Sequence, residues 1–271
     1  MPVEALAFLA GIAAGVLGAL IGIGGGVLLV PLLNGVMGLP FDIARGVSQA
    51  GVLATSVSGT VAPTSRRLVN YRLAVFLLAF SIGGALLGYF TLDLISDDVG
   101  ERILGTAMAT IAVIMLLRRN IRNVLPAETP NLGPFGARFF DDDTRREVAY
   151  RLRRPPLAAA VSFASGLLAS YIGIGGGIVI VPTLNALCGI PLRVAAATSV
   201  MMIGVTVIPG LAWSWSKGHL ADVTLTGATV LGALAGYQLG LRLSPRAPVR
   251  VIKTGTAVLL AIIAIQYLFL R

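Results

Sequence analysis

The sequence contains one cysteine, Cys188, and one histidine, His219, in 271 residues. A single cysteine excludes an internal disulfide and a metal site made of several thiolates. A single imidazole also excludes the histidine pair of many zinc sites. We therefore expect neither a bound metal nor a cofactor. His219 stands beside Lys217 and Asp222 in a predicted loop, where interfacial solvation explains it better than catalysis.

Charge is also scarce, because Asp, Glu, Lys and Arg make up only 12% of the chain. Soluble globular proteins contain about 25% charged residues. In contrast, 56% of the residues are hydrophobic, and the mean hydropathy is +0.88. The apolar segments cover residues 3–38, 41–64, 71–92, 99–117, 157–189, 192–213, 222–243 and 248–270. Segments of this length predict an all-α polytopic membrane protein embedded in a lipid bilayer.

A glycine-rich pentapeptide occurs as Gly22-Ile23-Gly24-Gly25-Gly26 and again, 151 residues later, as Gly173-Ile174-Gly175-Gly176-Gly177. Other residues recur at the same offset, namely Pro31 and Pro182, Asn34 and Asn185, Ser48 and Ser199, and Thr55 and Thr206. The chain is therefore an internal duplication. We predict a first membrane repeat at 1–117, a basic linker at 118–156 and a second membrane repeat at 157–271.

The first apolar segment of each repeat is too long for one straight membrane helix. Residues 3–38 would extend over about 54 Å, whereas the hydrocarbon core is about 30 Å thick. The segment must bend at its glycines, either as a crossing helix with an appended half-helix or as a hairpin that returns to the same side. Hairpins collect 17 Lys and Arg residues on one side and 4 on the other, whereas eight full crossings give 14 and 7. The positive-inside rule therefore favours hairpins.

A glycine-broken hairpin followed by three transmembrane helices crosses the membrane an odd number of times, so we predict two inverted repeats. Both termini then lie outside and the linker 118–156 lies in the cytoplasm. The first ten residues contain Glu4 but no basic residue. They lack the positive start of a signal peptide, and we interpret them as the start of a retained membrane helix.

The formal net charge of +9 has two explanations. Binding to nucleic acid is one, but the arginines cluster between hydrophobic segments, which favours topology-setting loops and no nucleic-acid partner. Within the linker, the acidic run Asp141-Asp142-Asp143 precedes Arg145 and Arg146. This order suits a short helix aligned with its dipole. We expect such a helix on the cytoplasmic membrane surface, as a solvated connector or a regulatory element.

Each glycine run precedes a short apolar stretch, which begins at Val27 in the first copy and at Ile178 in the second. The first N–H groups of a helix have no partner within it, and the helix dipole places partial positive charge there. Glycine has no side chain to shield these donors, so an anion can approach closely. We expect both half-helices to meet at mid-membrane and to bind an anion through Gly22, Gly24, Gly25, Gly26, Gly173, Gly175, Gly176 and Gly177.

The alternative is that these glycines only allow helices to pack closely. We expect that role for the glycines spaced four residues apart elsewhere, which are Gly11 and Gly15, Gly84 and Gly88, and Gly232, Gly236 and Gly240. The two hypotheses predict different structures. An anion site requires helices that are interrupted at both motifs, and a space between them that apolar side chains do not fill.

Polar residues near these segments form a second candidate group. Hydroxyl and amide groups can donate to anionic oxygens, although Ser and Thr also bond to their own helix or join neighbouring helices. The candidate contributors are Asn34, Ser48, Gln49, Thr55, Asn185, Ser199 and Thr206. Arg45, whose counterpart is Ala196, either attracts anions or extends to the interface. Carboxylates lie near segment ends, so a buried proton relay is not visible.

Enzymatic function is poorly supported. The run Gly46-Val47-Ser48-Gln49-Ala50 departs from a nucleophile elbow at its last position and lies in a predicted membrane helix. No base for a nucleophile is evident beside it, so we expect no enzyme.

The two motifs resemble those of the TauE/SafE family of sulfite exporters and toluene-sulfonate permeases. The resemblance rests on G-I-G-G-G-x-L-x-V-P-x-L at 22–33, on G-I-G-G-G-x-x-x-V-P-x-L at 173–184 and on the small-residue- and hydroxyl-rich helix after each. It covers nearly the whole chain. It implies transport of a small sulfur-containing anion, such as sulfite, thiosulfate or sulfoacetate, with substrate contacts at both motifs. It also implies a place in the cell inner membrane of a bacterium.

We therefore expect an anion transporter in which one half rocks against the other to alternate access. One alternative is a channel-like facilitator or a carrier for another small anion. Another is a non-transporting membrane subunit that binds partners through its linker. Helix faces made of small residues suit a homodimer and equally suit packing within one chain.

Overall fold

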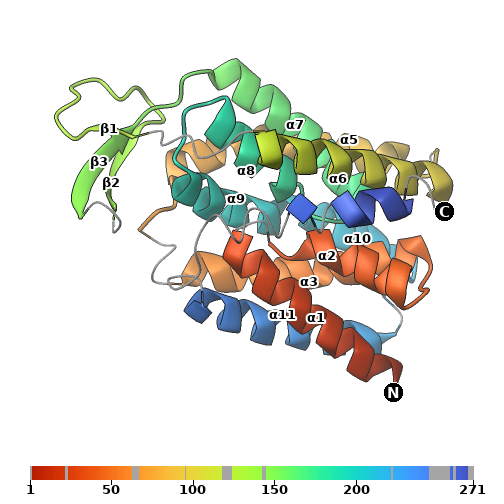
Figure 1. Cartoon of the computed structure of the whole chain (residues 1–271). Coiled ribbons are helices and arrows are strands. Elements are labelled where there is room, and N and C mark those ends of the chain that lie inside the picture. Colours follow the sequence, from red (N-terminus) through yellow and green to blue (C-terminus); the bar gives the residue numbers. More distant parts are fainter. Residues whose placement is uncertain are drawn as a thin grey trace.

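The structure is a computed structural model that describes residues 2–21, 24–62, 67–94, 96–117, 124–141, 145–220, 222–243, 257–258 and 261–267. Its helices run roughly along one common axis, with a small sheet at one end of the bundle and the start of α1 at the other (Figure 1). Four described helices are long and apolar enough to cross a membrane, namely Val3–Leu20, Tyr71–Leu92, Pro155–Ile172 and Leu192–Ser216. The prediction of an all-α polytopic membrane protein is confirmed.

The helix boundaries follow the apolar segments of the sequence. The first repeat contains α1 (Val3–Ile21), α2 (Gly26–Val30), the π-helix η1 (Pro31–Val36), α3 (Phe41–Val61), α5 (Tyr71–Leu92) and α6 (Asp97–Leu117). The second contains α7 (Pro155–Ile172), α8 (Gly177–Ala186), α9 (Leu192–Thr206), α10 (Ile208–Ser216) and α11 (Val223–Leu243). Of the last predicted segment, residues 257–258 and 261–267 are described, and they are helical.

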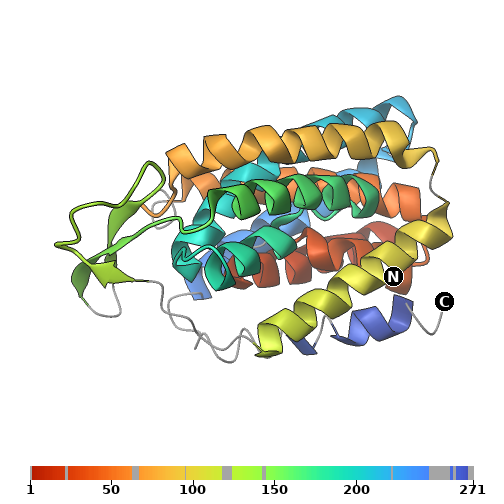
Figure 2. The same cartoon turned by 90° about the horizontal axis from the view of Figure 1, so that it is seen from above.

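The long first segment of each repeat bends back on itself, as predicted. From the end where the chain begins, α1 runs toward the sheet end, and α2 and η1 return beside it (Figures 1 and 2). In the second repeat, α7 runs away from the sheet end and α8 returns to it, so the backbone N–H of Arg153 reaches the carbonyl oxygen of Cys188 at 2.9 Å. The two hairpins therefore start from opposite ends of the bundle.

Each hairpin packs against a long helix of the other repeat. Helix α1 lies along α11, and α5 lies along α7. Glycines form the surfaces at which these helices touch. A Cβ on Gly11 would lie only 2.8 Å from the backbone nitrogen of Ala233, and one on Gly84 would lie 3.0 Å from that of Leu167. Glycine permits this approach because it has no Cβ. The packing role expected for these spaced glycines is confirmed.

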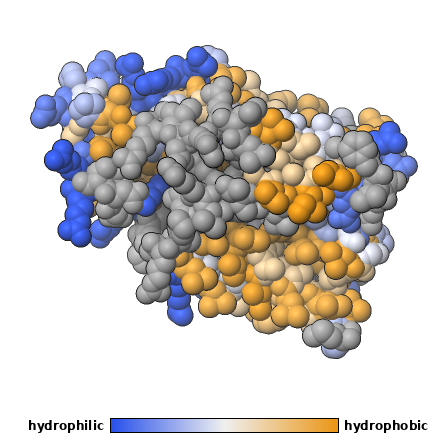
Figure 3. Space-filling view, viewed as in Figure 1, coloured by the Kyte–Doolittle hydropathy of each residue, from blue (hydrophilic) through white to orange (hydrophobic). Residues whose placement is uncertain are grey.

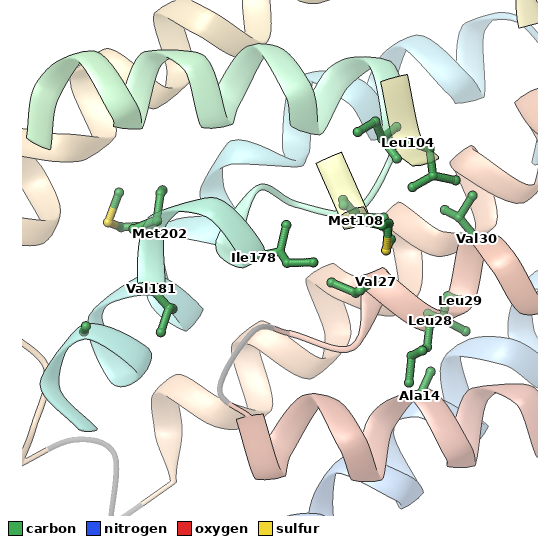
Figure 4. Packing of buried hydrophobic residues seen from close by; sticks show 14 of the residues in the cluster. Ala14, Val27, Leu28, Leu29, Val30, Leu104, Met108, Ile178, Val181 and Met202 are labelled. Carbon is green, nitrogen blue, oxygen red and sulfur yellow. The ribbon is translucent and has the colours of Figure 1, made fainter. Parts of the chain in front are cut away.

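Apolar side chains fill the interior and cover much of the outer face. The central cluster includes Val27 and Leu29 of α2, Ile178 of α8 and Met108 of α6 (Figure 4). On the outside, large hydrophobic residues of the long helices remain exposed, as expected for surfaces that face lipid (Figure 3). Polar residues gather at the sheet end instead.

The predicted short helix in the linker is wrong. Residues there form a three-stranded antiparallel sheet of β1 (Leu125–Pro126), β3 (Arg146–Tyr150) and β2 (Ala137–Asp141), in that order. Phe139 is buried and Phe140 is exposed, so this part alternates with the period of a strand. The prediction of a helix rested on acidic residues that precede basic ones, and this order does not determine the structure here. Asp142 and Asp143 lie outside the described residues.

Asn70 fastens the sheet to the membrane helices. Its side-chain amide donates to the carbonyl oxygen of Phe135 and to the hydroxyl of Tyr150, both at 2.9 Å. Its side-chain oxygen caps α5 by accepting from the backbone N–H of Leu73 at 3.0 Å. Burial raises the pKa of Tyr150 to about 12, so this hydroxyl stays protonated at neutral pH. The linker is therefore folded onto the helix bundle.

Candidate functional site

The two glycine motifs fold alike. Gly24 and Gly25 have φ of 80° and 75°, and Gly175 and Gly176 have φ of 76° and 71°. These are left-handed conformations that glycine adopts without the steric cost of a side chain. Gly25 and Gly176 are the N-cap residues of α2 and α8. The first requirement of the anion-site hypothesis, interrupted helices at both motifs, is met. Gly22, the first residue of the first motif, lies outside the described residues.

Helix α3 contacts both glycine segments through hydroxyl groups. Thr55 donates to the carbonyl oxygen of Gly24 at 2.9 Å. Ser48 lies about two turns earlier on the same helix, and its hydroxyl donates to the carbonyl oxygen of Gly173 at 3.1 Å, with Gly26 at 3.4 Å. The carbonyl groups of the breaks are thereby satisfied. The hydroxyls of α3 hold the two segments side by side at the centre of the bundle.

The second repeat supplies a different set of contacts. Ser165 of α7 donates to the carbonyl oxygen of Gly176 at 2.5 Å. Thr206, the counterpart of Thr55, bonds instead to its own helix at Met202 and to Ser81. Ser199 is fully buried, and its hydroxyl has no hydrogen-bond partner among the described residues. That hydroxyl lies 3.2 Å from the position that a Cβ on Gly177 would take, so it is a free donor beside the first turn of α8.

Two apolar side chains lie against both glycine segments, so the open space that the second requirement names is not present in this conformation. A Cβ on Gly175 would lie 3.0 Å from Val52 and would overlap Ile203. A Cβ on Gly24 would contact the same two side chains, at 3.9 Å and 3.6 Å. Val52 and Ile203 are buried and pack with Val207. In this conformation, we find these two side chains where the anion was expected.

The three remaining candidates form hydrogen bonds away from the glycine segments. Asn34 donates to the carbonyl oxygen of Leu39, and Asn185 donates to that of Ile190, both at 2.9 Å. Both asparagines therefore close the loop after their half-helix, at the end opposite the glycines. Gln49 donates to the hydroxyl of Tyr89 at 2.7 Å. The structure brings Ser48, Thr55 and Ser199 to the glycine segments, but not Gln49, Asn34, Asn185 or Thr206.

Sequence reasoning missed the residues that lie between the segments. Val52 and Ile203 occupy matching positions of the two repeats, 151 residues apart. That correspondence was a signal that could have found them, but apolar residues in an apolar helix carry no chemical signature. Ser165 has no such signal, because its counterpart is Ala14.

The described helices, their exposed apolar faces and the two interrupted hairpins define a multi-pass α-helical membrane protein. Among the residues that the structure describes, no group of His, Cys, Asp and Glu could hold a metal ion.

The chain belongs to the sulfite exporter TauE/SafE family, whose model matches residues 7–267. It is 27% identical to the probable membrane transporter protein YunE of Bacillus subtilis, over 96% of this chain and 95% of that protein. It is also 27% identical to the probable membrane transporter protein MamO of Paramagnetospirillum magneticum, of which it spans 43%. A probable membrane transporter protein of Xylella fastidiosa is 29% identical over 88% of this chain and 82% of that protein. No solved structure gives a significant match. The protein is thus a membrane transporter of this family.

Proposed function

We propose that the protein carries small sulfur-containing anions, such as sulfite, thiosulfate or sulfoacetate, across the inner membrane. The anion would bind between Gly24–Gly26 and Gly175–Gly177. The observation that carries the proposal is the pair of left-handed glycine breaks, each of which starts a half-helix at the centre of a membrane protein. Interrupted helices in matching halves are typical of transporter binding sites.

The chemistry of the segments suits an anion without a fixed cation. The first turns of α2 and α8 present backbone N–H groups and the positive ends of their dipoles. The hydroxyl of Ser199 adds a donor beside α8. Thr55 and Ser48 hold the carbonyl groups of the breaks, so these negative dipoles are already engaged.

Val52 and Ile203 must leave the space between the segments before an anion can occupy it. We therefore assign this conformation to a closed state. Helix α3 carries Val52 and α9 carries Ile203, so a relative movement of these two helices would separate the side chains. Such a movement is what alternating access by two rocking halves requires.

The direction of the hairpins supports inverted repeats, because α1 and α7 start from opposite ends of the bundle (Figure 2). The sheet of the linker lies opposite the start of α1. We propose that this sheet faces the cytoplasm, since most Lys and Arg residues lie on its side of the predicted topology.

Flux into proteoliposomes tests the proposal. Purified protein should accumulate labelled sulfite, thiosulfate or sulfoacetate, and replacement of Gly175 by Leu should abolish the flux, because that position has no room for a side chain. Gly227→Leu is the matched control, since a Cβ on Gly227 meets nothing within 4 Å. If none of the three anions is transported, the protein is no carrier for this class. Wild-type flux in Gly175→Leu would remove the site from the glycine segments.

A further inference from the structure

We infer that Arg45, Gln49 and Tyr89 form an anion-capture site that loads the central site from one side only. It would accept the charged head of a sulfur oxyanion or sulfonate. This inference rests on the proposed function and adds a second, peripheral site to it. The three side chains come from the start of α3 and the end of α5, which lie at the end of the bundle where the chain begins (Figure 1).

Arg45 carries a buried charge near the start of α3. Its side chain is only 4% exposed, so the guanidinium lies within the protein. Its guanidinium pairs with Asp42, whose side chain is 35% exposed. A buried charge is costly unless it is paired, and charged residues inside membrane helices mark substrate pathways. Because Asp42 is partly exposed, water can solvate its carboxylate when an arriving anion takes its place beside Arg45.

Aromatic rings hold the guanidinium in place. Its central carbon lies 5.1 Å from the ring centre of Trp213 and 5.9 Å from that of Phe41. Such cation–π contacts fix the plane of a guanidinium without neutralising its charge. Trp213 also contacts Lys217, at 5.5 Å. A planar donor fork is thereby presented in a fixed orientation, which suits two oxygens of a sulfonyl group.

The capture site is continuous with the second glycine motif. A Cβ on Gly173 would overlap the side chain of Arg45 and would lie 3.0 Å from its carbonyl oxygen. One helical turn further along α3, the amide of Gln49 donates to the hydroxyl of Tyr89 at 2.7 Å and accepts from Ser214 at 3.4 Å. These neutral groups lie one helical turn from Arg45, and we expect them to exchange partners with an anion that passes them.

The site exists on one side only, although the chain is duplicated. The counterpart of Arg45 is Ala196, and that of Gln49 is Val200. Removing the cation should therefore weaken uptake from the side where the chain begins and leave uptake from the side of the linker unchanged. A structural role would affect both directions alike.

Tryptophan fluorescence measures capture independently of transport. The chain has two tryptophans, Trp213 and Trp215, and Trp215 is 71% exposed. In a Trp215→Phe background, titration with thiosulfate and with sulfoacetate should change the emission of Trp213. Arg45→Gln should raise the apparent Kd about tenfold or more, the loss expected for a charge-assisted contact. Arg242→Gln, which removes an exposed arginine of α11, is the matched control.

Two further variants test the inference even if Arg45→Gln does not fold. Asp42→Asn removes the carboxylate that competes with the anion for Arg45, so it should lower the Kd for both probes. A higher Kd in Asp42→Asn would contradict the inference. Gly175→Leu should lose flux but keep the fluorescence titration, which separates this site from the central one. The inference is overturned if Arg45→Gln binds both probes as wild type does, or if it weakens uptake equally from both sides.

Discussion

The hydroxyl of Thr55 donates a hydrogen bond of 2.9 Å to the carbonyl oxygen of Gly24, and it thereby ties the continuous helix α3 to the break between α1 and α2. The carbonyl is buried at the centre of the membrane bundle, where water cannot replace the donor. Thr55 is therefore part of what keeps the first hairpin folded.

Thr55→Val should lower the free energy of unfolding by about 0.5–1.5 kcal/mol, because the Gly24 carbonyl loses the hydroxyl and keeps the N–H of Gly26. Thr60→Val is the control, since the hydroxyl of Thr60 donates to the carbonyl oxygen of Ser56 in its own helix. Thermal unfolding in detergent compares the two. Equal midpoints for both variants would mean that the bond to Gly24 contributes nothing.

The two motif glycines should respond differently to alanine. Gly24→Ala costs only the left-handed backbone strain of about 1–2 kcal/mol, because the new Cβ meets its neighbours at 3.6 Å or more. Gly175→Ala adds an overlap with Ile203, worth a further 1–3 kcal/mol, roughly, for overpacking. Unfolding measurements should therefore rank Gly175→Ala below Gly24→Ala in stability, and the reverse order would contradict the described packing.

Trimming the apolar pair between the glycine segments should favour anion access. Val52→Ala and Ile203→Ala each remove methyl groups that separate Gly24 from Gly175. We expect faster thiosulfate flux in both variants at a stability cost of about 1–4 kcal/mol for the cavity. Val57→Ala, an exposed position on the same helix α3, is the control. Slower flux in both variants, in protein that remains folded, would argue that the pair is not a barrier.

The pKa of the Cys188 thiol should differ between the folded and the unfolded protein. Burial raises the pKa of this thiol, and the nearby charge of Arg154 lowers it in part. The folded state therefore favours the thiol, so its contribution to stability is present below the unfolded pKa and is lost as the pH rises through the folded one. Alkylation, which needs the thiolate, should be slower in folded than in denatured protein and should accelerate with rising pH. Equal rates in both states at pH 8 would contradict this burial.

Single cysteines test the orientation. In a Cys188→Ala background, Phe140→Cys lies in the exposed part of β2 and Leu94→Cys in the loop after α5, where the wild-type side chains are 59% and 83% exposed. An impermeant maleimide applied to intact cells should label Leu94→Cys, whereas Phe140→Cys should react only after the membrane is opened. The opposite pattern would place the sheet outside the cell.

Much of the fold could be read from the sequence because its signals are local. Glycine runs and segment lengths indicated both hairpins, and the spaced glycines indicated helix faces that pack closely, although not that α1 would meet α11 and α5 would meet α7. The linker sheet was missed, because its strands depend on pairing between residues far apart, such as Phe139 with Val148. A charge pattern along one segment carries no information about that pairing.

The site was predictable only in part. Backbone breaks follow from glycine itself, so Gly24, Gly25, Gly175 and Gly176 were found. Side-chain partners depend on how helices rotate against one another, which periodicity within one helix does not fix. Thr55 and Thr206 are equivalent in sequence, yet only Thr55 bonds to a glycine segment. For the same reason, the matching repeat positions of Val52 and Ile203 did not by themselves fix that the two side chains would meet.

The helix contacts between the two repeats have a consequence for assembly. Gly11 and Gly15 pack against the backbone of α11, and Gly84 packs against the backbone of α7. Each half of the chain therefore carries glycine surfaces that fit helices of the other half. A separately expressed half would leave these surfaces open to lipid. A half on its own would need a second copy, lying head to tail, to cover these surfaces.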